Sequence, residues 1–281
     1  MKSSSNHVLF VSCPDRGGII HHVSGVLFRH GLNIIENHEF VDRKNNLFFM
    51  RTEFSGGVEV APILEELKQL LPKQTELKLH SQGPKKLVLL ATRESHCLGD
   101  LLLRHAAGEL NGEIVAVVSQ YSTLKKLVDR FEIPFHEVPV PEGERNLHET
   151  SLKKVIDSYS PDYLVLAKYM RILTPEFVQH YPDKIINIHH SFLPAFIGSN
   201  PYLQAYERGV KIIGATAHYV NDHLDEGPII TQSVIPVTHA QDAVALARAG
   251  RDVEKIVLAR ALSLVLENRV FVNGQKTMIF E

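Results

Sequence analysis

The stretch LVLLATRESHCLGDLLLRHAAGELNGEIVAVVS, residues 87–119, decides the fold class. It begins and ends with short apolar runs of the kind that form buried strands, and the segment between them predicts a helix. The same alternation of apolar strand and helix continues to residue 209. Strands that alternate with helices in this way are typical of a mainly parallel sheet with helices on both faces. The pattern therefore predicts a Rossmann-like, mainly parallel α/β domain.

The chain before this stretch has another pattern. Residues 6–81 contain a strand, a helix that ends at Gly31, two strand-like runs, a second amphipathic helix and a last strand. This βαββαβ order predicts a small ferredoxin-like α/β unit. A short polar linker with Gly and Pro follows, so we expect one domain at residues 1–82 and a second at residues 83–281.

The last part of the chain completes the second domain. After residue 209 the sequence predicts two more strands and a long helix near residues 242–267. The segment RVFVNGQKTMIF then predicts a small hairpin, because Asn273-Gly274 is a strong turn signal.

Composition excludes several classes of function. The formal net charge is -2, so the chain carries no large field of one sign and we expect no nucleic-acid partner. Cys13 and Cys97 cannot form a disulfide framework, and neither has metal-ligand spacing. The sixteen histidines are scattered without an HExxH pattern. We therefore expect two reduced thiols in a cytoplasmic protein that holds no metal.

Hydropathy argues against a membrane protein. No apolar stretch approaches the roughly 20 residues that are needed to span a bilayer. The N-terminal residues MKSSSNHVLFVSCPDRGG lack a long apolar core followed by a small-residue cleavage site. We expect no membrane partner and no signal peptide.

Two polar residues follow each other closely in the strand-like run IINIHH. Asn187 and His189 are two positions apart, so their side chains lie on the same face of a strand. Ligands of open α/β sheets bind at the carboxyl ends of strands, where this run ends. An amide that donates to a developing oxyanion, beside an imidazole that donates or relays a proton, suits attack on a carbonyl. Taken singly, either residue is also an ordinary turn or capping residue.

Asp225 lies in a second polar segment, HYVNDHLDEGPII. Its carboxylate has the chemistry to accept a proton from water or to fix the tautomer of His189. By itself, the Asp-Glu-Gly-Pro sequence is also a plain surface turn.

Three motifs in the same order resemble the formyltetrahydrofolate-dependent formyltransferase family over residues 87–281. They are LAKYMRIL, NIHHSFLP and DEGPII. The resemblance implies that Asn187 and His189 lie at the formyl oxygen and that Asp225 orders water and tunes His189. It also implies a folate substrate whose binding residues are Met170, Arg171, Ile172, Leu173, Glu226, Gly227 and Pro228.

The loop after the first strand of the second domain distinguishes members of that family from one another. Transferases that act on glycinamide ribonucleotide have a glycine-rich phosphate loop there, where backbone N–H groups bind the anion. This chain has LATRESHCLGDLL instead, with Arg93, Glu94 and His96, and the charge of Glu94 disfavours a phosphate. Water is then the natural acceptor of the formyl group.

Nearly the whole chain resembles the formyltetrahydrofolate deformylases. The resemblance implies hydrolysis of 10-formyltetrahydrofolate to formate and tetrahydrofolate, with no cofactor besides the substrate. It further implies that the formate supplies purine synthesis and that the reaction balances the one-carbon folate pools.

The N-terminal unit resembles an ACT domain at residues 14–19 (PDRGGI) and 31–34 (GLNI). This resemblance implies a homo-oligomer and an amino-acid effector bound near Asp15, Gly18 and Asn33. Relatives often have Pro where this chain has Gly17. An alternative is that the unit serves oligomerisation alone, through its edge strands.

Four further sites have competing interpretations. Cys97 is either a nucleophile or, as we favour, a core thiol. We expect Lys168 and Arg171 to lie at the surface or to contact the glutamate of folate, and His218 to lie in the core or to face the site. Gln120-Tyr121 stands where relatives often place Asn-His, with an unknown consequence.

Two alternative functions stay open at this point. The first is a formyltransferase with an amine acceptor, and the missing phosphate loop argues against it. The second is a non-catalytic amino-acid sensor, and the complete set of Asn187, His189 and Asp225 argues against it.

Overall fold

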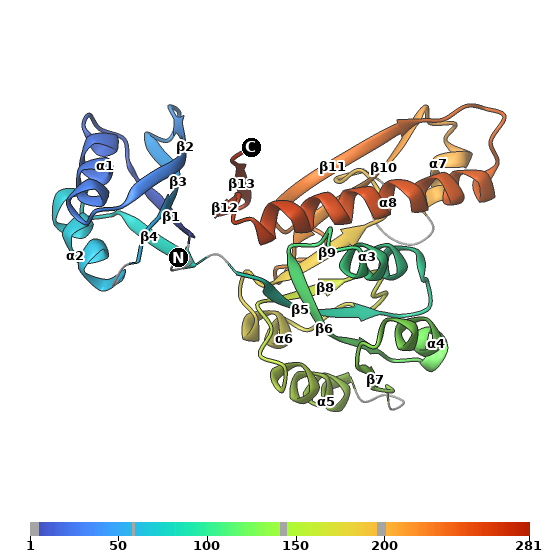
Figure 1. The fold of residues 1–281 in the computed structure, drawn as a ribbon. Helices are drawn as coiled ribbons and strands as arrows, with labels where there is room; N and C mark the ends of the chain where they lie inside the picture. The colour runs from blue at the N-terminus through green and yellow to red at the C-terminus, as the bar shows by residue number, and fades with distance from the viewer. Residues whose placement is uncertain (1–5, 58–59, 82, 141–144, 196–200) are drawn as a thin grey trace. The chain divides into compact units, whose positions relative to one another are not determined.

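The computed structural model describes residues 6–57, 60–81, 83–140, 145–195 and 201–281. The chain forms two compact units (Figure 1). The first unit consists of Met1–Gly83, Glu267–Phe271 and Met278–Glu281, and the second of Pro84–Leu266 and Val272–Thr277. The C-terminal segments are thus shared between the units. The domain boundaries drawn from the sequence stay predictions.

The first unit has the predicted βαββαβ order, which confirms the ferredoxin-like arrangement. Its elements are β1 (Asn6–Pro14), α1 (Ile19–Arg29), β2 (Asn33–Asp42), β3 (Leu47–Ser55), α2 (Val60–Leu70) and β4 (Glu76–Ser81). The sheet order is β2-β3-β1-β4, and the registered pairs are antiparallel. Helix α1 buries Ile19, Val23, Val26 and Leu27, the spacing of one helical face, in the core of this unit.

A second buried cluster, separate from the core around α1, explains why C-terminal segments belong to the first unit. Phe10 and Phe49 join Phe271 and Phe280 in a separate buried cluster. The rings of Phe10 and Phe271 meet edge to face, with centroids 5.6 Å apart. The buried guanidinium of Arg51 also donates to the backbone oxygen of Asn268 at 2.8 Å. These contacts bind the C-terminal segments to the sheet.

The second unit contains a seven-stranded sheet of order β11-β10-β9-β8-β5-β6-β7. Strands β5 to β9 pair in parallel, while β10 and β11 are antiparallel additions at one edge. The strands are β5 (Lys85–Ala91), β6 (Gly112–Ser119), β7 (Phe135–Glu137), β8 (Tyr163–Leu166), β9 (Ile185–His189), β10 (Ile212–Tyr219) and β11 (Ile229–Pro236). The predicted α/β class with a mainly parallel sheet is confirmed.

Helices cover both faces of this sheet (Figure 1). The helices are α3 (His96–Ala106), α4 (Lys125–Val128), α5 (Arg145–Asp157), α6 (Pro175–His180), α7 (Pro201–Glu207) and α8 (Ala243–Leu266). Buried residues of α5 and α6 share one core with β5, β6, β8 and β9. Helix α3 packs against α8, which in turn contacts β9, β10 and β11. The chain ends with the predicted hairpin of β12 (Val270–Asn273) and β13 (Lys276–Ile279).

One expected helix is much shorter than predicted. The segment TLKKLVDRF contains only α4, with a 3-10 turn on each side of it. Glu132 follows in a left-handed conformation, with φ of 57°, which stops further helical turns. Among the helices that the structure describes, none is long and apolar enough to cross a membrane.

Candidate active site

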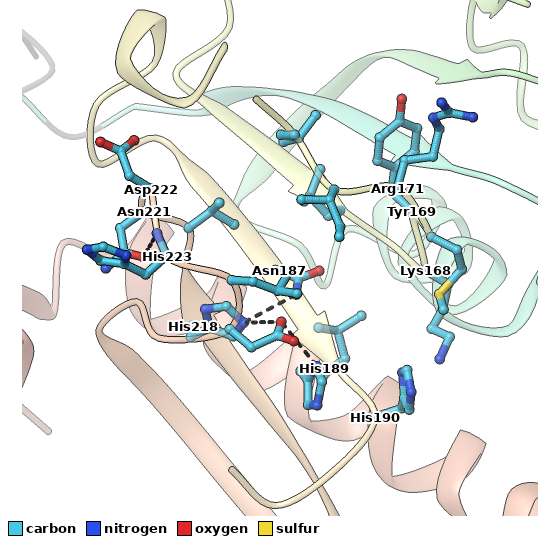
Figure 2. Close-up of a pocket in the computed structure, with 18 residues that line it drawn as sticks. Lys168, Tyr169, Arg171, Asn187, His189, His190, His218, Asn221, Asp222 and His223 are labelled. Carbon is cyan, nitrogen blue, oxygen red and sulfur yellow. Dashed lines mark hydrogen bonds and ion pairs between the residues drawn. The ribbon is translucent and has the colours of Figure 1, made fainter. Parts of the chain in front are cut away.

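A cavity of about 350 Å³ opens at the carboxyl ends of β8 and β9 (Figure 2). The loop that follows β10 completes its wall. The lining residues are Leu166, Lys168–Leu173, Asn187–His190, His218 and Val220–Asp225. This volume is within the range of small-molecule sites, and the position is the one where open α/β sheets bind ligands.

Strand β9 supplies two of the polar groups. Asn187 and His189 both line the cavity, as their spacing on one strand predicts. The apolar residues of β9 (Ile185, Ile186 and Ile188) are buried and fix the strand in the sheet. His189 is itself only 5% exposed, so its ring has little freedom to turn.

A tight turn after β10 brings Asp225 to the same place. Asp225 has φ of 58°, an uncommon left-handed conformation for a residue with a side chain. Gly227 is required here because a Cβ at this position would lie 1.7 Å from the backbone oxygen of Tyr219. The turn is closed by the N–H of Tyr219, which donates to the oxygen of Pro228 at 2.9 Å.

Asp225 and His189 form a close pair within the cavity wall. The carboxylate Oδ1 lies 3.2 Å from Nδ1 of His189. Burial alone would raise the pKa of Asp225, but its close contacts with His189 and His218 outweigh burial and hold the pKa well below its usual range. Asp225 is therefore a carboxylate at neutral pH, and it orients the His189 ring with a proton on Nδ1.

The second nitrogen of the His189 ring, Nε2, lacks a contact of this kind among the described residues. Nε2 is buried and has no hydrogen-bond partner among the described residues. Buried polar atoms without partners are rare in folded proteins and call for an explanation. Because His189 lines the cavity, a bound oxygen atom of a ligand or water is the natural partner.

His218 ties Asn187 into the same group. The register of β9 and β10 places His218 directly opposite Asn187, next to a bulge in the β10–β11 pairing. Nδ1 of His218 lies 2.8 Å from the backbone oxygen of Tyr219, which can only accept, so Nδ1 carries the proton. In the neutral ring Nε2 then accepts from the Asn187 amide at 3.2 Å. The other amide hydrogen of Asn187 is left for a ligand.

Apolar side chains form the rim of the cavity. Met170, Ile172 and Leu224 are each more than half exposed, although they are large and apolar. Exposed apolar groups around a concavity are typical of a ligand site. Arg171 stands among them and donates to the side-chain oxygen of Gln120 at 3.1 Å. Gln120 thus holds a residue of the cavity wall.

The family of the chain follows from its similarity to known proteins. Residues 85–262 match the formyl transferase family and residues 7–72 match the ACT domain. A formyltetrahydrofolate deformylase of Escherichia coli strain K12 is 54% identical over 279 residues, which cover 99% of this chain and 100% of that protein. This chain belongs to the formyltetrahydrofolate deformylase family.

Solved structures agree with this membership of the deformylase family. The crystal structure of a formyltetrahydrofolate deformylase from Pseudomonas syringae pv. tomato has a TM-score of 0.94 and 39% identity, and covers 100% of this chain and 96% of that one. A glycinamide ribonucleotide transformylase from Symbiobacterium toebii matches less of the chain. The match to this transformylase has a TM-score of 0.68 and 29% identity, and it covers 73% of this chain and 98% of the transformylase chain.

The predicted site residues of this deformylase family member fall into four groups. Asn187, His189 and Asp225 come together as described above. The segment Met170–Leu173 lines the same cavity. The other predicted substrate-binding residues, Glu226, Gly227 and Pro228, follow Asp225 but are not among the residues that line the cavity. The predicted regulatory residues, Asp15, Gly18 and Asn33, lie in the first unit at the ends of β1, α1 and β2.

Several lining residues were not singled out from the sequence. His190 stacks on His189 with ring centroids 5.0 Å apart and an interplanar angle of 15°. The segment Asn221–Leu224 forms the wall beside Asp225, and its polar Asn-Asp-His run was the available signal. The expected surface position of Lys168 is wrong, because its side chain is only 5% exposed. Carboxylates distant in the sequence surround it, so no local pattern could show this burial.

The remaining candidates have structural explanations. Cys97 is fully buried in α3, and burial raises the pKa of its thiol far above the usual value. This confirms a core thiol. Tyr121 lies under the guanidinium of Arg93, with 4.2 Å between Arg93 Cζ and the ring centroid.

Proposed function

We propose that this chain hydrolyses 10-formyltetrahydrofolate to formate and tetrahydrofolate, with Asn187, His189 and Asp225 as its catalytic residues. The observation that supports the chemistry best is the contact between the Asp225 carboxylate and Nδ1 of His189 in the cavity wall, which leaves Nε2 without a partner among the described residues. Membership of the deformylase family supports the substrate.

The reaction needs three functions that these residues supply. The Nδ1–H of His189 is held by Asp225, so Nε2 is unprotonated in the neutral ring and can take a proton from the attacking water. The amide of Asn187, fixed by His218, donates to the formyl oxygen as it becomes an oxyanion. The protonated His189 then returns its proton to the leaving nitrogen of the folate.

The exposed apolar rim supports a place for the flat ring system of the folate. Met170 and Ile172, from the loop after β8, and Leu224, from the loop after β10, offer apolar contact. We propose that the neighbouring backbone of residues 170–173 and 225–228 provides the polar contacts to the pterin. Arg171, held by Gln120, is suited to an anionic part of the substrate.

Water rather than an amine is the proposed acceptor. Glu94 occupies the loop where related transferases would need to bind a phosphate, and its carboxylate pairs with Arg251 at 3.4 Å. We propose that the reaction needs no cofactor besides its substrate, since the protein groups above supply the proton acceptor and the oxyanion donor. The product formate would then supply purine synthesis in the cytoplasm.

We propose two roles for the ACT-like unit, namely homo-oligomerisation and the binding of an amino-acid effector near Asp15, Gly18 and Asn33. Strand β2 is at the edge of its sheet and exposes two large apolar side chains, Ile35 and Phe40. Such an edge favours pairing with a second copy.

The direct experiment measures formate and tetrahydrofolate released from 10-formyltetrahydrofolate with no amine added. The wild type should release both in equal amounts, and His189→Ala should lose most of the rate. His180→Ala is the matched control, because His180 is about half exposed, pairs with Asp157 at 3.2 Å and does not line the cavity. An inactive wild type would refute the proposal, and a fully active His189→Ala would refute the role of His189.

A further inference from the structure

One wall of the cavity is a loop without regular secondary structure. It connects the end of β8 at Leu166 to the start of α6 at Pro175, and residues 168–173 line the cavity. Within it, Met170 and Ile172 expose large apolar side chains. Loops are usually more mobile than the elements that they connect, so a loop that binds a flat ring system in one geometry needs fixed points. Two such points are provided by adjacent residues of α5.

The first fixed point is the hydroxyl of Tyr169. Nε2 of His148 lies 3.1 Å from this hydroxyl, and both side chains are buried. Nδ1 of His148 lies 3.3 Å from the backbone oxygen of Pro139, which can only accept, so Nδ1 carries the proton. Burial lowers the pKa of His148, and the neutral ring accepts the hydrogen bond of Tyr169 at Nε2.

The second fixed point is Thr174, the residue directly after the cavity-lining segment. Its backbone N–H donates to Oε1 of Glu149 at 2.9 Å, and its hydroxyl donates to Oε2 of the same carboxylate. The hydroxyl also accepts from the N–H of Phe177 at 3.2 Å, so Thr174 caps α6 as well. Both oxygens of Glu149 are thus engaged by one residue of the loop.

The polar residues of α5 are an expensive way to pack a helix. Glu149 is only 6% exposed, and a buried carboxylate is costly unless hydrogen bonds compensate it. Further along the same helix, Leu152 and Ile156 join the apolar core with β5, β6, β8 and β9. Apolar side chains would therefore suffice to hold α5 on the sheet. The presence of His148 and Glu149 instead indicates a role in the loop that they contact.

We propose that Glu149 and His148 are positioning residues, which hold the segment Tyr169–Thr174 in the geometry that binds the folate ring system. This inference rests on the proposed function for the identity of the substrate. Neither residue lines the cavity, so both act through the loop.

The loop is separate from the groups that carry the proposed chemistry. Asn187 and His189 belong to β9, and in Figure 2 both lie apart from Tyr169 and Arg171. A loosened loop should therefore weaken the binding of substrate and transition state by similar amounts. Such a loss raises KM and leaves kcat unchanged. A general loss of stability would act differently, because it lowers the amount of active enzyme and leaves KM unchanged.

The test uses Glu149→Ala, with steady-state kinetics on 10-formyltetrahydrofolate and calorimetric titration with tetrahydrofolate. We expect KM and the Kd of tetrahydrofolate to rise about tenfold or more, with kcat unchanged. Glu149→Gln should restore both constants, because its amide can accept from the N–H of Thr174 and donate to its hydroxyl. The matched control is Glu176→Ala, which removes a largely exposed carboxylate that pairs with Lys153 of α5 at 3.0 Å. Both of its constants should equal those of the wild type.

A folded Glu149→Ala enzyme with the KM and Kd of the wild type would overturn the inference, and so would a fall in kcat alone. If Glu149→Ala does not fold, Tyr169→Phe provides the test, because it removes one hydroxyl and keeps the ring. Its KM and Kd should rise about threefold or more with an unchanged kcat, and unchanged constants would overturn the inference. A wild type that binds tetrahydrofolate but releases no formate would refute the proposed function, and the Kd values would still test the positioning of the loop.

Discussion

Nδ1 of His189 lies 3.2 Å from Oδ1 of Asp225, and the remaining nitrogen of the same ring is buried without a partner among the described residues. One contact thus fixes both the orientation and the tautomer of the ring, and leaves Nε2 for the reaction. The arrangement depends on a strand that carries His189 and on a strained turn that carries Asp225.

Asp225→Asn should reduce kcat by about a thousandfold or more. The amide can no longer fix the tautomer of His189, nor stabilise the positive charge that His189 gains when it takes up a proton. Steady-state kinetics with 10-formyltetrahydrofolate measure this loss. Asp222→Asn is the control, since Asp222 lines the same cavity and accepts an exposed hydrogen bond from Gln179. Similar losses in both variants would contradict a specific role for Asp225.

Asn187→Ala should lose about 3–4 kcal/mol of transition-state stabilisation, or roughly a hundred- to a thousandfold in kcat, if its amide is the oxyanion donor. KM should change little, because the interaction forms mainly in the transition state. Thermal unfolding checks that the variant is folded. A folded Asn187→Ala enzyme with full kcat would remove this residue from the mechanism.

Gly227→Ala should abolish most activity and lower the melting temperature. A Cβ there would lie 1.7 Å from the backbone oxygen of Tyr219, so the turn that positions Asp225 has to move. Gly17→Ala is the control, because its Cβ would meet no atom within 4 Å. Thermal melts and activity of the two variants give the comparison, and a stable, active Gly227→Ala would show that the turn is not needed.

The buried carboxylate of Glu254, which contacts His96, Lys168 and Tyr202, should make stability depend on pH. Glu254 has a pKa of about 2 in the fold, against an ordinary value of 4.5. A lowered pKa stabilises the fold above the ordinary value, here by about 3 kcal/mol, and the contribution is lost as pH falls toward 2. The difference in unfolding free energy between the wild type and Glu254→Gln should therefore narrow by about 2 kcal/mol from pH 7 to pH 3.

Denaturant titrations at both pH values measure this narrowing. Glu176→Gln, which removes a largely exposed partner of Lys153, should show none of it. A difference for Glu254→Gln that stays constant with pH would mean that Glu254 is not charged in the fold.

Both thiols should resist alkylation in the native protein. Cys13 and Cys97 are at most 1% exposed, and burial raises the pKa of each thiol. Treatment with iodoacetamide at pH 7.5, followed by mass spectrometry, should find both cysteines unmodified and activity intact. Rapid loss of activity on modification of Cys97 would revive its interpretation as a nucleophile.

The fold could be predicted well from the sequence because its signals are local. The alternation of apolar strands with helices predicts the parallel sheet, and the two-residue spacing predicts that Asn187 and His189 share a face. The contacts that complete the site are not local. Asn187 meets His218 through strand pairing, and Lys168 meets Glu254, which lies far along the sequence in α8. Short motifs carry no information about such partners, so the burial of Lys168 could be found only in three dimensions.

The measurement that tests the central claim most directly is turnover of 10-formyltetrahydrofolate in water enriched in the heavy isotope of oxygen, with no amine added. Attack by water on the formyl carbon predicts that each formate released by the wild type carries one heavy oxygen atom, as detected by mass spectrometry. Release of unlabelled formate, or release only after an amine is added, would contradict hydrolysis at this site.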